Sequence, residues 1–371
     1  MPNTHLRPTS ADDAVPGRIL RAEPMTARLV PGWAIRARAW RVRYESTTAT
    51  GEPTVVSGTI LAPERLRSGA PLLGFAPGTQ GLAHTAAVSR LLRYGLEYEG
   101  AFLAAALGRG WVLAVTDYPG LGTPGTHPYV VGPANGRAVL DIMRAARTSP
   151  ELGLDPSGVA GVYGYSEGGN AAGWAAQLQP GYAPDVALAG VAVGGAPVDL
   201  MELSEALDTS LFAFLLIYAA IGMDASFPEL RLDEFLNTRG RLAAAVMKRT
   251  HIVPAVALGL ALPKTRARYL AEDLLRDPAW IARMSEASLG HLPPGAPVLI
   301  GHGRQDQVLP YRQSELLLRR WRALGADATH HRIAWGEHLT AAPQFARAGF
   351  AFLGGRFAAW ERAGLAGSTA V

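Results

Sequence analysis

The chain has 371 residues, of which 49% are hydrophobic and 18% are charged, and it contains no cysteine. Because soluble proteins carry roughly 25% charged residues, this composition predicts a large buried core or an apolar surface. The absence of cysteine excludes disulfides, thiol nucleophiles, zinc–thiolate sites and iron–sulfur clusters. The formal net charge is only +4 and the arginines are scattered, which argues against a nucleic-acid partner.

The first twenty residues are polar and are interrupted by Pro2, Pro8 and Pro16. They lack the apolar run of about seven or more residues that a signal peptide requires. We therefore expect a cytoplasmic protein as numbered, or a secreted one if the N-terminus has been trimmed. The apolar runs 211–222 and 252–262 are shorter than the roughly twenty residues of a spanning helix, so no transmembrane segment is expected.

Short apolar segments in the first half of the chain predict the strands of a sheet. Residues 33–44 suggest a strand with interleaved arginines. Its alternation slips, so we expect an antiparallel edge strand with solvated arginines and a bulge near Ala39 or Trp40. Further strands are predicted at 54–61, 71–76, 111–116, 159–163 and 186–194.

The strand at 111–116 runs into a glycine-rich loop, Gly120–Gly125, with the G-x-G-x-x-G spacing of a dinucleotide site. Pro124 and the residues at 126–129 prevent a helix from opening at the third glycine, so no helix N-terminus is available for a pyrophosphate. We therefore reject a dinucleotide site and expect no cofactor, with the next helix starting only near Ala134.

Ser166 lies in GYSEG (164–168), a G-x-S-x-G motif between a predicted strand and a predicted helix. A sharp turn at such a junction lifts the serine hydroxyl above the sheet edge, and glycines remove side chains that would collide. Small residues such as Ala171 and Ala172 let the helix pack closely on the sheet. We therefore expect Ser166 to be a nucleophile rather than part of a structural turn.

A serine hydroxyl becomes a good nucleophile only when a base removes its proton, and a carboxylate must hold that base. In the chain order serine, acid, histidine, the candidates are Asp306, after a strand predicted at 298–301, and His338, after a strand at 330–334. Loops at the C-terminal ends of adjacent parallel strands lie side by side, so these residues can meet at one edge of the sheet.

Two other acids compete with Asp306, namely Asp199, after the strand at 186–194, and Glu337, beside His338. We favour Asp306. The chain has no H-E-x-x-H motif and no cluster at metal-ligand spacing, so no metal site is expected. The histidines expected to be structural or pocket-lining are His84, His127, His302, His330 and His331.

The loop PGTQG (77–81) leaves a strand upstream of the nucleophile, where a second oxyanion donor is expected. We assign the donors to the backbone N–H of Thr79 and to that of Glu167, the residue after the serine. A plain glycine turn is the alternative interpretation of the loop. The side chains predicted to bind substrate are Gln80, Tyr118 and Tyr165.

About a hundred residues with helical patterning separate the strand at 186–194 from the strand at 298–301. We predict a helical cap here, whose apolar segments form its own core, line an acyl-chain pocket over Ser166, or both. The predicted divisions are an N-terminal extension (1–27), a core (28–199 and 291–361), a cap or lid (200–290) and a C-terminal tail (362–371).

Several stretches together resemble a known family: FAPGTQGLA (75–83), TDYPGLGTPGTHPY (116–129), GYSEGGNAAGWAA (164–176), GRQDQVLP and GEHL. They look like the secretory, lipase A-type lipases of fungi and bacteria, over about residues 28–353. The resemblance implies an α/β-hydrolase fold, with a mostly parallel sheet, helices on both faces and the cap inserted after the sixth core strand. It also supports Ser166, Asp306 and His338 as a catalytic triad. The family often has glutamine at the position of Glu167, a change that should keep the backbone donor and alter the pH response.

The residues and the resemblance predict a serine carboxylic-ester hydrolase, an esterase or lipase that forms an acyl-enzyme on hydrophobic acyl esters, including acylglycerols. An acyltransferase that uses the same serine is the alternative, and a non-catalytic ligand-binding relative is a third. The expected partner is a small-molecule or lipid ester, and the cap could contact a lipid interface.

Overall fold

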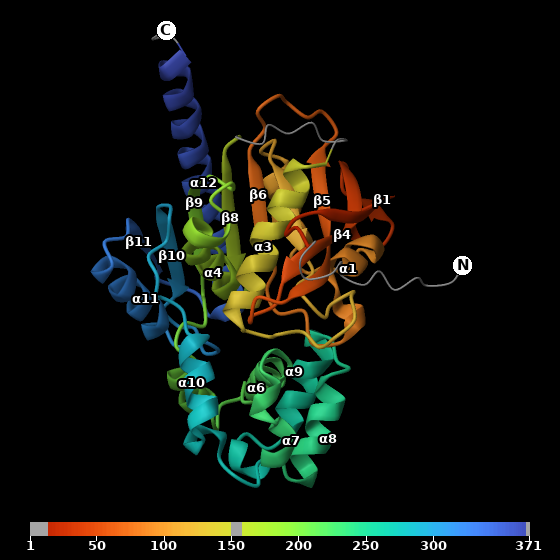
Figure 1. The fold of residues 1–371 in the computed structure, drawn as a ribbon, viewed down its shortest axis with the longest axis vertical. Coiled ribbons are helices and arrows are strands. Elements are labelled where there is room, and N and C mark those ends of the chain that lie inside the picture. The colour runs from red at the N-terminus through yellow and green to blue at the C-terminus, as the bar shows by residue number, and fades with distance from the viewer. Residues whose placement is uncertain (1–13, 150–157, 369–371) are drawn as a thin grey trace.

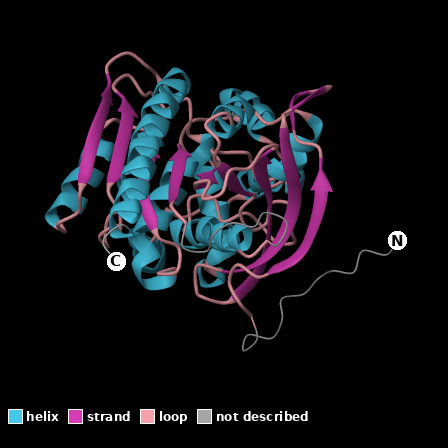
Figure 2. Ribbon diagram, turned by 90° about the horizontal axis from the view of Figure 1, so that it is seen from above, coloured by secondary structure: helices cyan, strands magenta, loops and turns pink. Residues whose placement is uncertain are grey.

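The computed structural model describes residues 14–149 and 158–368. Within these residues, nine strands form one sheet in the order β1-β4-β5-β7-β6-β8-β9-β10-β11, and β2 pairs with β3 (Figures 1 and 2). The strands from β7 across to β11 are parallel, and β1, β4 and β5 are antiparallel to their neighbours. The strands are β1 (Ile19–Met25), β2 (Arg28–Val30), β3 (Trp33–Ala34), β4 (Ala37–Thr47), β5 (Pro53–Pro63), β6 (Leu72–Ala76), β7 (Val112–Thr116), β8 (Ala160–Tyr165), β9 (Leu188–Gly194), β10 (Val298–Gly303) and β11 (Ala328–Ile333).

The bulge expected near Ala39 or Trp40 was a wrong prediction. β4 pairs with β5 in one continuous register from Ala37 to Thr47, and β1 covers its other side, so β4 is not an edge strand. The apparent slip in alternation has a simple cause. Arg36 precedes the strand, and Arg38 lies near its exposed end with its guanidinium 5.6 Å from the centre of the Trp40 ring.

The other predicted strands are present, and the helix after the glycine-rich loop starts at Gly132, so no helix opens at Gly125. None of the helices in the described residues is both long and apolar enough to cross a membrane. The helices are α1 (Val88–Tyr94), α2 (Gly100–Leu107), α3 (Gly132–Arg147), α4 (Glu167–Tyr182), α5 (Leu200–Leu207), α6 (Phe214–Ser226), α7 (Leu232–Phe235), α8 (Thr238–Met247), α9 (Ile252–Ala261), α10 (Pro278–Glu286), α11 (Arg312–Ala323) and α12 (His338–Ser368).

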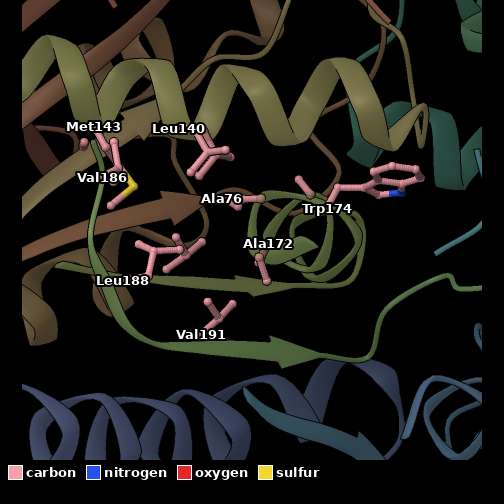
Figure 3. Packing of buried hydrophobic residues seen from close by; sticks show 14 of the residues in the cluster. Ala76, Leu140, Met143, Ala172, Trp174, Val186, Leu188 and Val191 are labelled. Atoms are coloured by element: carbon pink, nitrogen blue, oxygen red, sulfur yellow. The ribbon is translucent and has the colours of Figure 1, made fainter. Parts of the chain in front are cut away.

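Two apolar cores cover the two faces of the sheet. Alternate residues of a strand face opposite sides, so Val112 and Ala114 enter one core while Leu113 and Val115 enter the other. The first core is completed by α3, α4 and α11, and the second by α1, α2 and α12. Figure 3 shows the first core, in which Met143 and Leu140 of α3 and Trp174 of α4 pack over the strands.

The turn from β8 into α4 is extremely tight. Ser166 has φ 60° and ψ −124°, a backbone conformation that costs energy for a residue with a side chain. A Cβ on Gly164 would lie 2.0 Å from the carbonyl oxygen of Gly168, and a Cβ on Gly168 would lie 2.0 Å from that of Ala76. The glycines therefore allow α4 to begin directly against the end of β6.

The helices α5 to α10 lie between β9 and β10 in sequence and beyond one end of the sheet in space (Figure 1). They share an apolar cluster that includes the fully buried Tyr218 and Trp280, and loops of the sheet region contribute Tyr129 and Val308 to it. Whether this segment is a separate cap, and where the four divisions of the chain begin and end, stays a prediction.

Replacing Gly168 with alanine tests the tight turn. The added methyl collides with the backbone of β6, so we expect Gly168→Ala to lower the free energy of unfolding by about 1–3 kcal/mol. Gly181 is the matched control, because it lies in the same helix and a Cβ there meets nothing within 4 Å. Gly181→Ala should leave stability unchanged or raise it by up to about 1 kcal/mol. Chemical denaturation measures both, and equal effects of the two substitutions would contradict the packing argument.

Candidate active site

The structure brings together the three side chains predicted to form a triad. Ser166 follows β8, Asp306 follows β10, and His338 begins α12 after β11. The Nε2 atom of His338 lies 2.9 Å from the Oγ atom of Ser166, and its Nδ1 atom lies 2.7 Å from Oδ2 of Asp306. These are hydrogen-bond distances, so the imidazole can take a proton from the hydroxyl while the carboxylate holds the opposite nitrogen.

The side chain of Asp306 is fully buried but its environment favours the ionised form. Its Oδ1 atom accepts hydrogen bonds from the backbone N–H groups of Val308 and Leu309, at 2.9 and 2.8 Å. Its Oδ2 atom also lies 3.2 Å from Nε2 of His302. Burial alone would raise the pKa of Asp306, but hydrogen bonds from His302 and His338 outweigh burial and hold that pKa well below its usual range.

The two competing acids are engaged elsewhere. Asp199 caps α5 by accepting from the N–H of Glu202, and it pairs with Arg320 at 2.6 Å. Glu337 accepts hydrogen bonds from Gln307 and from the first turn of α12, which lower its pKa to about 2. In this geometry, Asp306 is the acid that contacts His338.

The backbone of His338 is held on both sides. The hydroxyl of Tyr165 donates to the carbonyl oxygen of His338 at 2.8 Å, and its ring packs against the imidazole. The N–H of His338 donates to the side chain of Gln307 at 3.2 Å. These contacts limit how far the imidazole can move away from Ser166.

The two expected oxyanion donors are available for a ligand. Within residues 14–149 and 158–368, no group accepts a hydrogen bond from the N–H of Thr79 or from that of Glu167. Both residues line the same cavity as Ser166. Oxyanion stabilisation requires such unoccupied donors beside the nucleophile.

Side chains hold each residue of the loop at 77–80. None of these side chains was predicted to support the loop, and Tyr118 was predicted to bind substrate instead. The contacts are Tyr118 Oη to the carbonyl of Pro77 (2.9 Å), the N–H of Gly78 to Glu99 (2.8 Å), Tyr98 Oη to the carbonyl of Thr79 (3.2 Å), Tyr129 Oη with Thr79 Oγ1 (3.2 Å) and Gln80 Nε2 to Glu97 (3.2 Å). This loop is therefore held by side chains from several other segments of the chain.

Glu97 and Glu99 form a buried carboxyl pair behind this loop. Glu97 accepts from the N–H of Glu99 at 3.0 Å, and burial raises its pKa to about 7. Burial and the neighbouring charge of Glu97 raise the pKa of Glu99 well above its usual value. No motif in the sequence marks this pair, since its partners lie about twenty residues away. At neutral pH, the pair carries less than two negative charges.

A cavity of 690 Å³ opens above Ser166 between the sheet region and the helices α5 to α10. Its wall includes Tyr165 but neither Gln80 nor Tyr118, whose polar atoms bind Glu97 and Pro77 instead. Substrate contact by these three side chains stays a prediction. Most of the wall is apolar and comes from the helices, for example from Leu203, Phe214, Ala220, Met223 and Trp280.

Of the five histidines expected to be structural or pocket-lining, four contact polar groups. His84 contacts the carbonyl oxygen of Thr123. His127 contacts Glu167, His302 contacts Asp306, and His330 contacts Ser314. The part of the chain that the structure describes holds no group of three His, Asp or Glu side chains arranged to bind a metal ion.

The chain is similar in sequence and in fold to known lipases. A family model described as secretory lipase matches residues 86–363. The chain is 28% identical to a protein of Mycobacterium tuberculosis named probable inactive lipase, over 95% of this chain and 80% of the relative. It is 26% identical to a secreted triacylglycerol lipase of Malassezia furfur, over 74% of this chain and 75% of the relative.

Among solved structures, lipase A of Candida antarctica in its closed state aligns with 96% of this chain and 85% of its own. The TM-score is 0.86 and the sequence identity is 20%. This likeness confirms the expected α/β-hydrolase fold, with its mostly parallel sheet flanked by helices.

The raised pKa of Glu97 predicts a pH-dependent stability. Because its folded pKa of about 7 exceeds the ordinary value of 4.5, folding takes up a proton between these values. This stabilising contribution is fully present below about pH 4.5 and is lost as the pH rises through 7. In the wild type, the free energy of unfolding should decrease by on the order of 3 kcal/mol across this window, and Glu97→Gln should remove this decrease. Urea denaturation at several pH values measures it, with the exposed Glu52→Gln as control. The same slope in wild type and Glu97→Gln would contradict the prediction.

Proposed function

The chain belongs to the secretory lipase family, and from this premise we propose that it hydrolyses carboxylic esters through an acyl-enzyme formed on Ser166. The observation that carries the proposal is the continuous hydrogen-bonded series Asp306–His338–Ser166, at 2.7 and 2.9 Å, at the floor of an apolar cavity. One relative is named as probably inactive, but in this chain His338 contacts both Ser166 and Asp306, as a working triad requires.

In the first step, Nε2 of His338 takes the proton of Ser166 as Oγ attacks the ester carbonyl carbon. The negative charge that develops on the carbonyl oxygen is stabilised by the N–H groups of Thr79 and Glu167. His338 then gives the proton to the alcohol oxygen as the C–O bond breaks. Because Asp306 stays ionised, it stabilises the positive imidazole throughout this step.

In the second step, His338 takes a proton from water, and the resulting nucleophile attacks the acyl-enzyme carbonyl. The same two N–H groups stabilise the second oxyanion. The carboxylic acid leaves, and the proton returns from His338 to Ser166. In the acyltransferase alternative, an alcohol or amine takes the place of water and accepts the acyl group. This alternative requires no other residue.

The cavity supports a hydrophobic acyl group as substrate. We infer that the segment 200–290 acts as a cap whose helices enclose the acyl chain, since most of the cavity wall comes from it. Three side chains in the wall are also largely exposed, namely Tyr98, Val253 and Leu339. They give the mouth an apolar rim that could contact a lipid interface. The cytoplasmic location expected for the chain as numbered stays a prediction, while a relative is named as secreted.

Removing members of the triad tests the mechanism. Ser166→Ala should abolish hydrolysis of 4-nitrophenyl esters, and Asp306→Asn should lower kcat by about 10⁴-fold because the imidazole loses its correct tautomer. Asp199→Asn is the matched control and should keep activity near the wild-type level, since Asp199 binds Arg320 instead. Retained activity in Asp306→Asn, or loss of activity in Asp199→Asn, would mean that Asp306 is not the acid of the triad. A separate assay distinguishes a hydrolase from an acyltransferase. It compares the amount of free carboxylic acid formed with the amount of acyl group transferred to an added alcohol, and a hydrolase forms mainly the free acid.

Filling the cavity tests the acyl site. Ala220 lies in the wall on α6, so Ala220→Phe should lower kcat/KM for a dodecanoyl ester by about tenfold or more while a butanoyl ester is much less affected. Leu242→Phe serves as control, because Leu242 is 67% exposed on α8 and lies outside the wall. An equal loss for both chain lengths would place the acyl group elsewhere.

A further inference from the structure

The loop between β7 and α3 carries a histidine that the proposed mechanism does not use. His127 and Glu167 are both 1% exposed, and Nε2 of His127 lies only 2.6 Å from Oε1 of Glu167. Glu167 is the residue whose backbone N–H is proposed to stabilise the oxyanion. The loop that resembled a dinucleotide site therefore reaches the nucleophile turn instead.

The hydrogen-bond geometry indicates how many protons the two side chains hold between them. The Nδ1 atom of His127 faces the carbonyl oxygen of Pro119 at 3.2 Å, and because a carbonyl only accepts, we assign a proton to Nδ1. A neutral imidazole would then present a lone pair to the lone pairs of an ionised Glu167 at 2.6 Å, which is repulsive. A second proton must lie between the two groups. We propose that His127 and Glu167 share this proton and that the pair is a positioning device for the oxyanion donor of Glu167.

Aromatic rings join this pair to the other oxyanion donor. The imidazole of His127 stacks on the ring of Tyr118, with centroids 5.5 Å apart, and meets the ring of Tyr129 edge-on at 6.2 Å. Tyr118 in turn donates to Pro77, and Tyr129 contacts Thr79. One loop thus supports both sides of the oxyanion hole.

The shared proton also controls the local charge. With it, the pair has no net charge; without it, a negative charge lies beside the position where the oxyanion forms. The titratable groups around the pair are Tyr118 and Tyr129 on the same loop, Tyr218 on α6, which packs on Tyr129, and Tyr98 and Glu99 behind the loop at 77–80. Burial and the proximity of Glu167 raise the pKa of Tyr118 well above its usual value, so this phenol does not supply a compensating charge. Loss of the proton at high pH should therefore slow the reaction.

The experiment rests on the proposed esterase function and compares kcat against pH. In Glu167→Gln, the amide donates to a neutral His127 and no carboxyl can lose a proton. The alkaline decrease in kcat should therefore move to higher pH by about one unit or more. His127→Leu leaves Glu167 buried without its partner and should lower kcat about 10- to 100-fold, with KM changed about twofold at most, because the donor is misplaced in the transition state.

His84→Leu is the matched control, because His84 contacts the same loop at the carbonyl of Thr123 but is exposed. It should keep the wild-type kcat and pH profile. The pair can also be observed without turnover, since its short hydrogen bond should give a strongly downfield proton resonance that both Glu167→Gln and His127→Leu remove.

The outcomes separate the two proposals. The same pH profile in wild type and Glu167→Gln, together with an unchanged downfield resonance, overturns the shared proton even if the protein is an esterase. If the wild type is inactive but shows the downfield resonance, and both variants lack that resonance, the esterase function is overturned while the shared proton is retained. If His127→Leu does not fold, as judged by circular dichroism, Glu167→Gln alone decides.

Discussion

The close contact between the start of α4 and the end of β6 is the constraint on which the site depends. It exists because Gly164 and Gly168 have no Cβ, so the helix begins within van der Waals distance of the strand backbone. The left-handed backbone of Ser166 is the cost of this turn. In return, Ser166 lines the cavity, and the N–H of Glu167 is left without an intrahelical acceptor, so one turn supplies both the proposed nucleophile and a proposed oxyanion donor.

The parallel order of the strands then determines which distant segments meet at Ser166. β8, β10 and β11 end at the same edge of the sheet, and Asp306 and His338 follow the last two. The glycine loop after β6 ends at the same edge, and its Gln80 carbonyl accepts from the N–H of Ile252 at the start of α9 at 2.8 Å. The helical segment is thus hydrogen-bonded directly to the loop at 77–80, so a displacement of these helices would also displace a proposed oxyanion donor.

Much of the site could be predicted from the sequence because its chemistry follows chain order. A serine in a G-x-S-x-G turn, followed by an acid and a histidine after later strands, has few alternatives, and the structure places Ser166, Asp306 and His338 in contact. What could not be predicted are contacts set by packing. His127 reaches Glu167 across 40 residues, and the Glu97–Glu99 pair is defined by burial. The hydrogen bond from Tyr118 to the carbonyl of Pro77 is another such contact, while the predicted contact of Tyr118 with substrate stays a prediction. The bulge in β4 was a wrong prediction, because periodicity alone does not say where a strand starts.

The most direct test of the account is covalent labelling of the nucleophile. A fluorophosphonate reacts with a serine only when a base and an oxyanion hole activate it. The account predicts one adduct per chain, on the peptide that contains Ser166, with hydrolytic activity lost in proportion to labelling and with labelling strongly slowed in the His338→Ala variant. An adduct on another residue, or full ester hydrolysis by protein that is completely labelled at Ser166, would contradict it.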